Sequence, residues 1–151
     1  MRFPYRAYEV AATPASAAND GCIYRPVVPF TLAGPTETLD FFGLLDTGAD
    51  ETYITRRMAE RLGLLVGASS EYVIESAGGE VSVTYGVVAI EVTDGTERHK
   101  WQTTVGITDQ EWSEAILGHS GFLEFFDVLF RGCEHEVVLS RNAAELPDAR
   151  R

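Results

Sequence analysis

The chain is poor in cysteine, in positive charge and in long apolar runs, and each shortage excludes a class of protein. Cys22 and Cys133 are the two cysteines in 151 residues, too few for a disulfide framework. Lys and Arg number 12 against 23 Asp and Glu, so the formal net charge is -11 and clustered contacts to nucleic-acid phosphates are not expected. No apolar run reaches the roughly 18 residues of a membrane span, and the first ten residues lack the apolar centre of a signal peptide. These absences predict a cytoplasmic protein that binds neither nucleic acid nor membrane.

The chain also lacks an internal repeat, and its length suits one domain with a hydrophobic core. Residues 11–20 are small, polar and proline-containing, and the last residues show no periodicity. The composition therefore predicts an N-terminal arm over residues 1–20, one domain over residues 21–140, and a flexible tail over residues 141–151.

Between these ends, short apolar segments alternate with frequent turn signals, which predicts a mostly β protein. A helix is expected over residues 55–63, with Thr55 as its N-cap and Gly63 just past its end. Residues 70–92 predict a long hairpin with two glycines at its tip. A second short helix, capped by Ser120, is expected in residues 120–126, and a last hairpin closes the chain. The predicted fold class is all-β with one or two short helices.

One strand of this pattern ends in a carboxylate where the core should be. The apolar run before it leads into Asp46, Thr47, Gly48, Ala49 and Asp50. A buried carboxylate without partners is unfavourable, so it normally shifts its pKa, finds partners or serves a function. A turn aspartate that satisfies nearby backbone amides is the ordinary alternative for Asp46, but it leaves the flanking apolar run unexplained.

Two later segments accompany this loop. The hairpin with Gly78 and Gly79 at its tip comes first, and the string "AILGHSGFL" (residues 115–123) comes after it. In this order and spacing, the three features resemble the retropepsin-like (retroviral-type) aspartic protease family, in particular its small single-domain members. The resemblance covers roughly residues 24–140.

The resemblance implies a retropepsin-like half-barrel that acts as an aspartic endopeptidase on polypeptides. Peptide hydrolysis by carboxylates needs a pair of them, one acting as base and one as acid. Since the chain has one Asp-Thr-Gly string and no second lobe, a protease would need Asp46 from a second copy, which predicts a two-fold homodimer. No organic cofactor and no metal are expected, because the three histidines and the Cys133-x-His135 pair do not form a metal-ligand pattern.

The family pattern also assigns residues to roles in this chain. Asp46 would be catalytic, and Thr47, Gly48 and Ala49 would complete the active-site loop. Substrate binding is implied for the residue after this loop and for the hairpin tip, which would act as a flap: Asp50, Ser76, Ala77, Gly78 and Gly79. The second signature consists of Ile116, Leu117, Gly118 and His119.

One position departs from the viral members of the family. They have an arginine that pairs with the position of Asp50, whereas this chain has His119 there. A histidine could pair with Asp50 only while protonated.

Two alternatives to a protease homodimer remain open: a non-catalytic homodimeric peptide-binding or assembly module that keeps the fold, and a monomer that pairs with a different Asp-bearing chain. Asp50 and the glycine-tipped turn also have ordinary structural explanations, as an exposed acid and as a hairpin turn.

Overall fold

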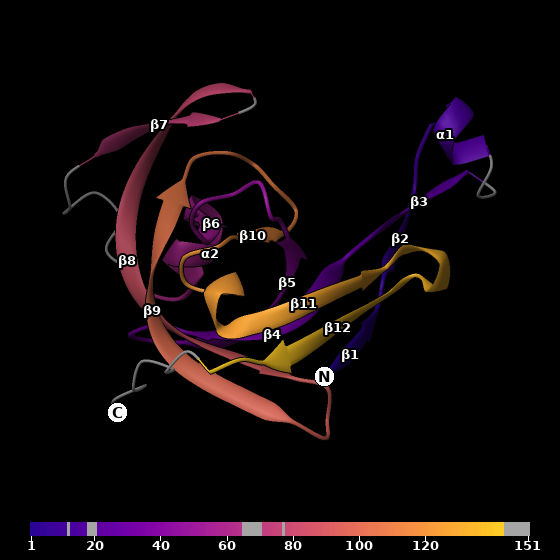
Figure 1. Cartoon of the computed structure of the whole chain (residues 1–151). Coiled ribbons are helices and arrows are strands. Elements are labelled where there is room, and N and C mark those ends of the chain that lie inside the picture. The colour runs from indigo at the N-terminus through magenta and orange to yellow at the C-terminus, as the bar shows by residue number, and fades with distance from the viewer. Residues whose placement is uncertain (12, 18–20, 65–70, 77, 144–151) are drawn as a thin grey trace.

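Strands make up most of the molecule (Figure 1). The computed structural model describes residues 1–11, 13–17, 21–64, 71–76 and 78–143. Its main sheet has seven strands, in the spatial order β4 (Val27–Ala33), β5 (Thr38–Leu45), β10 (Ala115–Leu117), β6 (Tyr53–Thr55), β9 (Arg98–Thr108), β8 (Gly79–Thr93) and β7 (Tyr72–Ser76). β4 also pairs with β8, so the sheet closes on itself as a barrel.

The barrel interior is filled by the apolar side chains that alternate along its strands. In β4, the buried residues Val28, Phe30 and Leu32 follow the two-residue period of a strand with one buried face. Trp101 of β9 is fully buried, donates through Nε1 to the carbonyl oxygen of Gly121 at 2.9 Å, and packs edge-on against three phenylalanines, Phe122, Phe125 and Phe126. This aromatic cluster attaches the segment after β10 to the barrel.

A second, three-stranded sheet joins the two ends of the described chain. Its order is β1 (Arg2–Pro4), β12 (Glu136–Arg141) and β11 (Phe126–Arg131), with the 3₁₀ turns η1 (Leu123–Phe125) and η2 (Gly132–Glu134) before and after β11. Met1 and Phe3 are buried in the core with Val137 and Leu139. The first residues therefore pack with the body of the protein.

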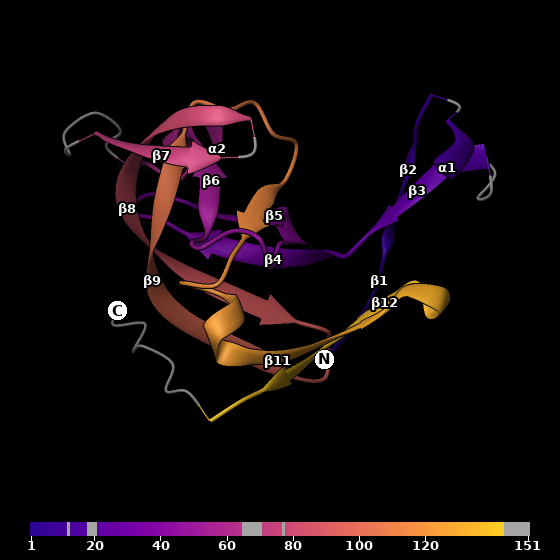
Figure 2. The ribbon, with the colours of Figure 1, turned by 45° about the horizontal axis from the view of Figure 1, so that its top comes forward.

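A separate hairpin, β2 (Arg6–Glu9) with β3 (Cys22–Arg25), projects from the body, with the four-residue helix α1 (Pro14–Ala17) near its tip (Figure 2). Composition predicted irregular structure over residues 11–20, and α1 is a difference from that expectation. We call β2 and β3 the arm hairpin. The division of the chain at residues 20 and 140 stays a prediction.

The helix predicted over residues 55–63 is confirmed. α2 (Arg56–Arg61) begins after Thr55, whose hydroxyl accepts a hydrogen bond from the backbone N–H of Met58, and Gly63 follows the helix with a positive φ of 76°. The all-β class is confirmed as well. Among the described residues, no helix is long and apolar enough to cross a lipid bilayer.

Candidate active site

The loop that follows β5 is folded around the carboxylate of Asp46. The backbone N–H of Asp46 donates to the carbonyl oxygen of Leu117 at 3.1 Å, which fixes the loop to β10. The N–H of Gly48 donates to Asp46 Oδ1 at 2.9 Å, and the N–H of Ala49 donates to the Asp46 carbonyl oxygen at 3.3 Å. Asp46 is half-buried, whereas Thr47 and Gly48 are exposed. The carboxylate is thus held by its own loop and is accessible from outside.

The segment after β10 braces this loop through backbone hydrogen bonds. The N–H groups of His119 and Ser120 donate to the carbonyl oxygens of Ala49 (2.9 Å) and Asp50 (2.8 Å), and the N–H of Thr52 donates to the Ser120 carbonyl oxygen (3.0 Å). Ser120 therefore does not cap a helix as predicted; the turn η1 begins later and has no side-chain cap.

Gly118 makes the close approach of the two segments possible. A Cβ atom at this position would lie 2.1 Å from the carbonyl oxygen of Glu51 and 2.7 Å from that of Ala49. Both neighbours are backbone atoms, so they cannot move aside as a flexible side chain could. A glycine is therefore required where the second signature crosses the loop.

His119 does not pair with Asp50. Its Nε2 lies 3.0 Å from the carbonyl oxygen of Thr47, which can only accept, so the ring donates its Nε2–H to the loop. The carboxylate of Asp50 is exposed and forms no ion pair within the described part of the chain. The pairing considered from the sequence is thus wrong here, because the histidine is used to hold the loop backbone, and a neutral imidazole suffices for that bond.

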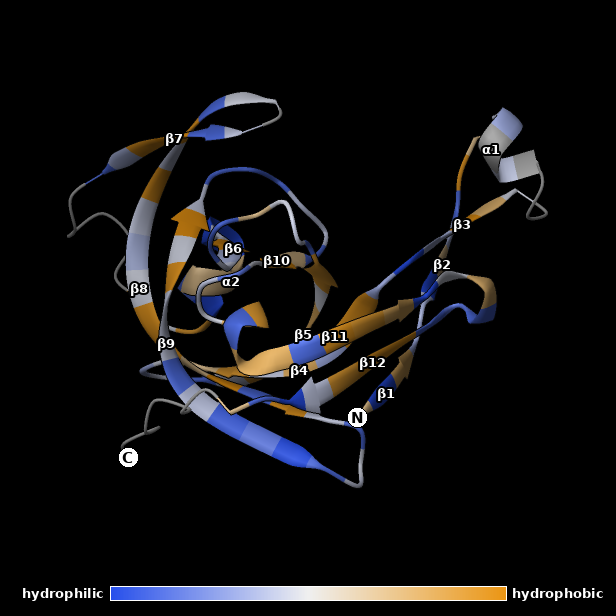
Figure 3. Cartoon of the chain, in the orientation of Figure 1, coloured by the Kyte–Doolittle hydropathy of each residue, from blue (hydrophilic) through white to orange (hydrophobic). Residues whose placement is uncertain are grey.

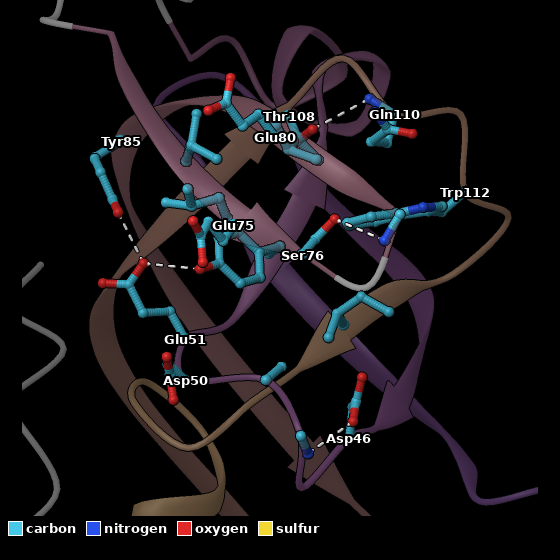
Figure 4. Close-up of a pocket in the computed structure, with 18 residues that line it drawn as sticks. Asp46, Asp50, Glu51, Glu75, Ser76, Glu80, Tyr85, Thr108, Gln110 and Trp112 are labelled. Atoms are coloured by element: carbon cyan, nitrogen blue, oxygen red, sulfur yellow. Dashed lines mark hydrogen bonds between the residues drawn. The ribbon is translucent and has the colours of Figure 1, made fainter.

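A cleft of about 960 Å³ lies beside the loop, under the β7–β8 hairpin (Figure 4). Of the residues assigned from the sequence, the structure places seven in its lining: Asp46, Gly48, Ala49, Asp50, Ser76, Gly78 and Ile116. The others lie elsewhere: Leu117 is buried in the core, Thr47, Gly79, Gly118 and His119 do not line the cleft, and Ala77 lies outside the described residues.

The predicted hairpin over residues 70–92 is present as β7 and β8. Ser76 pairs directly with Gly79, and the Ser76 hydroxyl accepts from the Gly78 N–H and donates to the Gly79 carbonyl oxygen. Gly79 has a φ of 111°, which non-glycine residues rarely adopt. The turn is therefore tight, and both of its strands contribute cleft-lining residues.

Sequence reasoning missed a three-residue cluster in the cleft wall. Glu51 Oε2 accepts hydrogen bonds from the hydroxyls of Tyr85 (2.8 Å) and Tyr53 (3.1 Å). Burial, and then the bond to Glu51, raises the pKa of Tyr85 to about 12, and burial with the charge of Glu51 raises the pKa of Tyr53 well above its usual value. Glu51 and Tyr53 are two positions apart, which is a local signal for a shared face, but Tyr85 lies on β8 and only the fold brings it there.

Acidic side chains dominate the charge of this cleft. Asp46, Asp50, Glu51, Glu75 and Glu80 all line it, and the lining contains no Lys, Arg or His within the described ranges. Glu75 and Glu80 lie directly opposite each other across the β7–β8 hairpin. In the same ranges, no three His, Cys, Asp or Glu side chains converge as they would around a metal ion.

A family of known proteins matches the part of the chain that forms this site. The family described as gag-polyprotein putative aspartyl protease matches residues 37–124, more than half of the chain. The chain belongs to this family. The match spans the loop, the hairpin and the second signature, so the predicted retropepsin-like aspartyl protease membership is confirmed.

Two solved protease structures are similar to this family member. A retropepsin-like aspartic protease from Rickettsia conorii matches with a TM-score of 0.52 at 16% identity, covering 78% of this chain and 89% of that one. The EIAV protease in complex with the inhibitor HBY-793 matches with a TM-score of 0.47 at 26% identity, covering 63% of this chain and 82% of that one. No curated protein sequence matches the chain. The match to the Rickettsia conorii structure shows that this aspartyl protease family member has the retropepsin fold that its sequence predicted.

Proposed function

We propose that this protein is an aspartic endopeptidase that acts as a homodimer, with one Asp46 from each chain. Membership of an aspartyl protease family supports the reaction type. The position of Asp46 supports its role, because its carboxylate is accessible in a cleft wide enough for a peptide and is held by a glycine N–H. A polypeptide substrate and a cytoplasmic location are part of this proposal.

The observation that supports this proposal most directly is that each chain has one accessible Asp46 in its cleft. Within the described residues, its carboxylate accepts one hydrogen bond, from Gly48. Hydrolysis requires a second carboxyl group close enough to share a proton with the first. With one Asp-Thr-Gly string in the chain, the second group comes from another copy, across the exposed Thr47 and Gly48.

The reaction then follows from the protonation states of the pair. One Asp46, as carboxylate, takes a proton from water, and the water oxygen forms a bond to the scissile carbonyl carbon. The other Asp46, protonated, donates to the carbonyl oxygen, which gives a neutral gem-diol. Transfer of a proton to the amide nitrogen accompanies cleavage of the C–N bond and releases an amine and a carboxylic acid.

The surrounding residues fit an extended peptide. The turn at Ser76, Gly78 and Gly79 stands over the cleft and offers backbone groups to a strand-like substrate. The exposed carboxylate of Asp50 at the cleft wall can accept from substrate main-chain N–H groups. Closure of this hairpin over the peptide would exclude water from the dyad.

The test compares Asp46→Asn with Asp40→Asn on a diverse peptide library between about pH 4 and pH 7. Asp40→Asn is the matched control because it makes the same chemical change on β5, the strand that leads into Asp46. Asp40 is exposed, and within the described residues its carboxylate accepts one side-chain hydrogen bond, from Thr31. We expect Asp46→Asn to lower kcat/KM by at least about 1,000-fold and Asp40→Asn to change it less than about twofold. Dilution should lower the wild-type rate faster than linearly.

Three further results would count against this function. If the folded, dimeric wild type gives no cleavage that depends on Asp46, the non-catalytic peptide-binding module becomes the better account. If the rate stays flat between about pH 4 and pH 8, no shared proton controls the reaction. A strictly linear dilution series would contradict the homodimer and favour a dyad of different origin.

A further inference from the structure

The loop between β9 and β10, residues 109–114, forms a wall of the cleft to which no role has yet been given. We call it the β9–β10 loop. Its residues Gln110 and Trp112 line the cleft, and so does Ile116, which follows on β10. Trp112 is 38% exposed and lies across the cleft from Glu51 (Figure 4). A peptide bound in the cleft would therefore run along this loop.

The backbone of the β9–β10 loop does little to hold the loop in place. The loop is hydrophilic along most of its length (Figure 3), and residues 109–113 are exposed. Within the described part of the chain, residues 110–113 form no hydrogen bond to another backbone group, although the N–H of Gln110 donates to the Thr108 hydroxyl at 3.2 Å. A segment with so few backbone hydrogen bonds opens easily unless side chains hold it.

Side chains anchor this loop at both ends. At its start, Asp109 forms an ion pair with Arg56 at the beginning of α2. At its end, Glu114 Oε1 accepts a hydrogen bond of 2.7 Å from the hydroxyl of Tyr8, on β2 of the arm hairpin. The loop runs toward the side from which the arm hairpin projects (Figure 1). The arm hairpin thus holds one end of the cleft wall.

The ring of Tyr8 is itself held in place. The guanidinium groups of Arg25 and Arg6 lie 5.2 Å and 5.6 Å from the centre of this ring. The guanidinium of Arg6 also lies 4.1 Å from the centre of the Phe42 ring on β5. Cations are attracted to the faces of aromatic rings. A series of contacts therefore connects β5, through Arg6 and Tyr8, to the end of the β9–β10 loop.

The hydroxyl of Tyr8 is a donor throughout the pH range of the cleavage assay. Burial, and then the hydrogen bond to Glu114, raises the pKa of Tyr8 from 10.0 to about 12. The phenol therefore stays protonated between about pH 4 and pH 7. A hydrogen bond from a hydroxyl to an ionised carboxylate is among the stronger ones in proteins.

We propose that Tyr8 is a positioning residue for the candidate active site: through Glu114 it fixes the β9–β10 loop, so that Gln110 and Trp112 form a preorganised wall for the peptide. This inference rests on the proposed function, since it names a residue outside the cleft that governs binding of the substrate. The wall contacts the peptide in the ground state and in the transition state alike. Loss of the Tyr8 hydroxyl therefore acts on KM and leaves kcat nearly unchanged.

The test compares Tyr8→Phe with Tyr24→Phe in the full chain. Both changes remove one hydroxyl from the arm hairpin and keep the ring, and the hydroxyl of Tyr24 forms no hydrogen bond within the described residues. We expect Tyr8→Phe to raise KM about five- to tenfold with kcat within about twofold of the wild type. Tyr24→Phe should leave both constants within about twofold. Glu114→Gln keeps an acceptor oxygen for Tyr8, so it should raise KM less than Tyr8→Phe does.

Tryptophan fluorescence measures the position of the loop without a substrate. Trp101 is fully buried, so quenching of the emission by acrylamide reports mainly on Trp112. Tyr8→Phe should raise the quenching constant by at least about 1.5-fold, because a released loop exposes its side chains more often. Tyr24→Phe should leave it unchanged. Circular dichroism and sedimentation velocity check the fold and the homodimer on the same samples, and a rise in KM that accompanies weakened dimerisation would overturn the positioning role.

Wild-type KM and quenching in Tyr8→Phe would overturn the inference. Increased quenching with an unchanged KM would overturn it as well, because the loop would then not contact the substrate. The two measurements also separate this inference from the proposed function. Asp46-dependent cleavage with unchanged KM and quenching would leave the protease and refute the positioning role, whereas increased quenching without any Asp46-dependent cleavage would leave the anchor of the loop and refute the protease.

Discussion

At the scale of single residues, Glu51 depends on the fold for one of its two hydrogen-bond partners. Its carboxylate accepts from two tyrosine hydroxyls that come from β6 and β8. These bonds fix the carboxylate in the cleft wall, beside the loop that carries Asp46. Burial, and then the neighbouring carboxylate of Glu51, raises the pKa of both phenols and keeps them protonated.

This arrangement predicts a pH dependence of stability at alkaline pH. The pKa of Tyr85 is raised in the folded chain to about 12 from its ordinary value of 10.0. Between these two values, the unfolded chain has lost the proton and the folded chain keeps it, so stability is fully present below about pH 10 and falls as the pH rises toward 12. Tyr85→Phe should therefore give a shallower fall of the urea midpoint between about pH 9 and pH 11.

Glu51→Gln is the companion variant, because it removes the charge and keeps the size. It should make the same fall shallower but not abolish it, since burial comes before Glu51 among the causes of the shift in the Tyr85 pKa. If the urea midpoint of Tyr85→Phe falls with pH as steeply as that of the wild type, the hydroxyl of Tyr85 does not titrate as described.

Residues with a local signal could be predicted from the sequence. Asp46 stood out by its place at the end of an apolar run, and Thr55 by the capping preference of its side chain, which the structure confirms. The bond of Tyr85 to Glu51 and that of His119 to Thr47 could not be predicted, because each joins segments that lie far apart in the sequence. Local patterns do not encode such pairings.

At the scale of elements, the loop that carries Asp46 and the segment after β10 form one unit. Three backbone hydrogen bonds and a parallel bridge between Glu51 and Ser120 join them. The junction has no room for a side chain at Gly118. The geometry of Asp46 therefore depends on a segment that the chain reaches only after β7, β8 and β9.

Substitution of Gly118 tests this dependence. Gly118→Ala should lower the free energy of unfolding by about 2 to 4 kcal/mol, since the added Cβ meets backbone atoms. Gly132→Ala is the control, because nothing lies within 4 Å of a Cβ there. Equal urea midpoints for the two variants would contradict the close packing of loop and signature.

The elements near the ends were the least predictable. Composition indicated an N-terminal arm, but β1 pairs with β12, which comes from the opposite end of the described chain. Such a pairing leaves no periodic signal in either segment beyond ordinary strand alternation. The hairpins β7–β8 and β11–β12 could be predicted because each is formed by neighbouring segments with a turn signal between them.

At the scale of the whole molecule, the charge distribution predicts which peptides bind best. Five carboxylates line the cleft, and the body is acidic, with a net charge of -11 for the chain. Opposite charges attract over a distance that salt shortens to about 10 Å at 0.1 M ionic strength. Peptides that carry Lys or Arg beside the scissile bond should therefore have a higher kcat/KM than peptides with Glu at the same place.

The measurement compares two peptides that differ only in Lys or Glu at one position, at about 0.02 M and about 0.5 M salt. The advantage of the Lys peptide should be about tenfold at low salt and should shrink at high salt. Glu80→Gln should reduce it, whereas Asp40→Asn, which neutralises an acid outside the cleft, should not. A preference for the Glu peptide at low salt would show that the cleft charges do not act on the substrate.

The position of β10 has a consequence for how the protein is made. β10 lies between β5 and β6 in space but comes after β9 in sequence. The groups that hold the Asp46 loop from outside, at Leu117, His119 and Ser120, are therefore among the last of the barrel to leave the ribosome. A nascent chain shorter than this has the Asp-Thr-Gly string but lacks the hydrogen bonds that hold it, so the proposed activity requires that the barrel is complete.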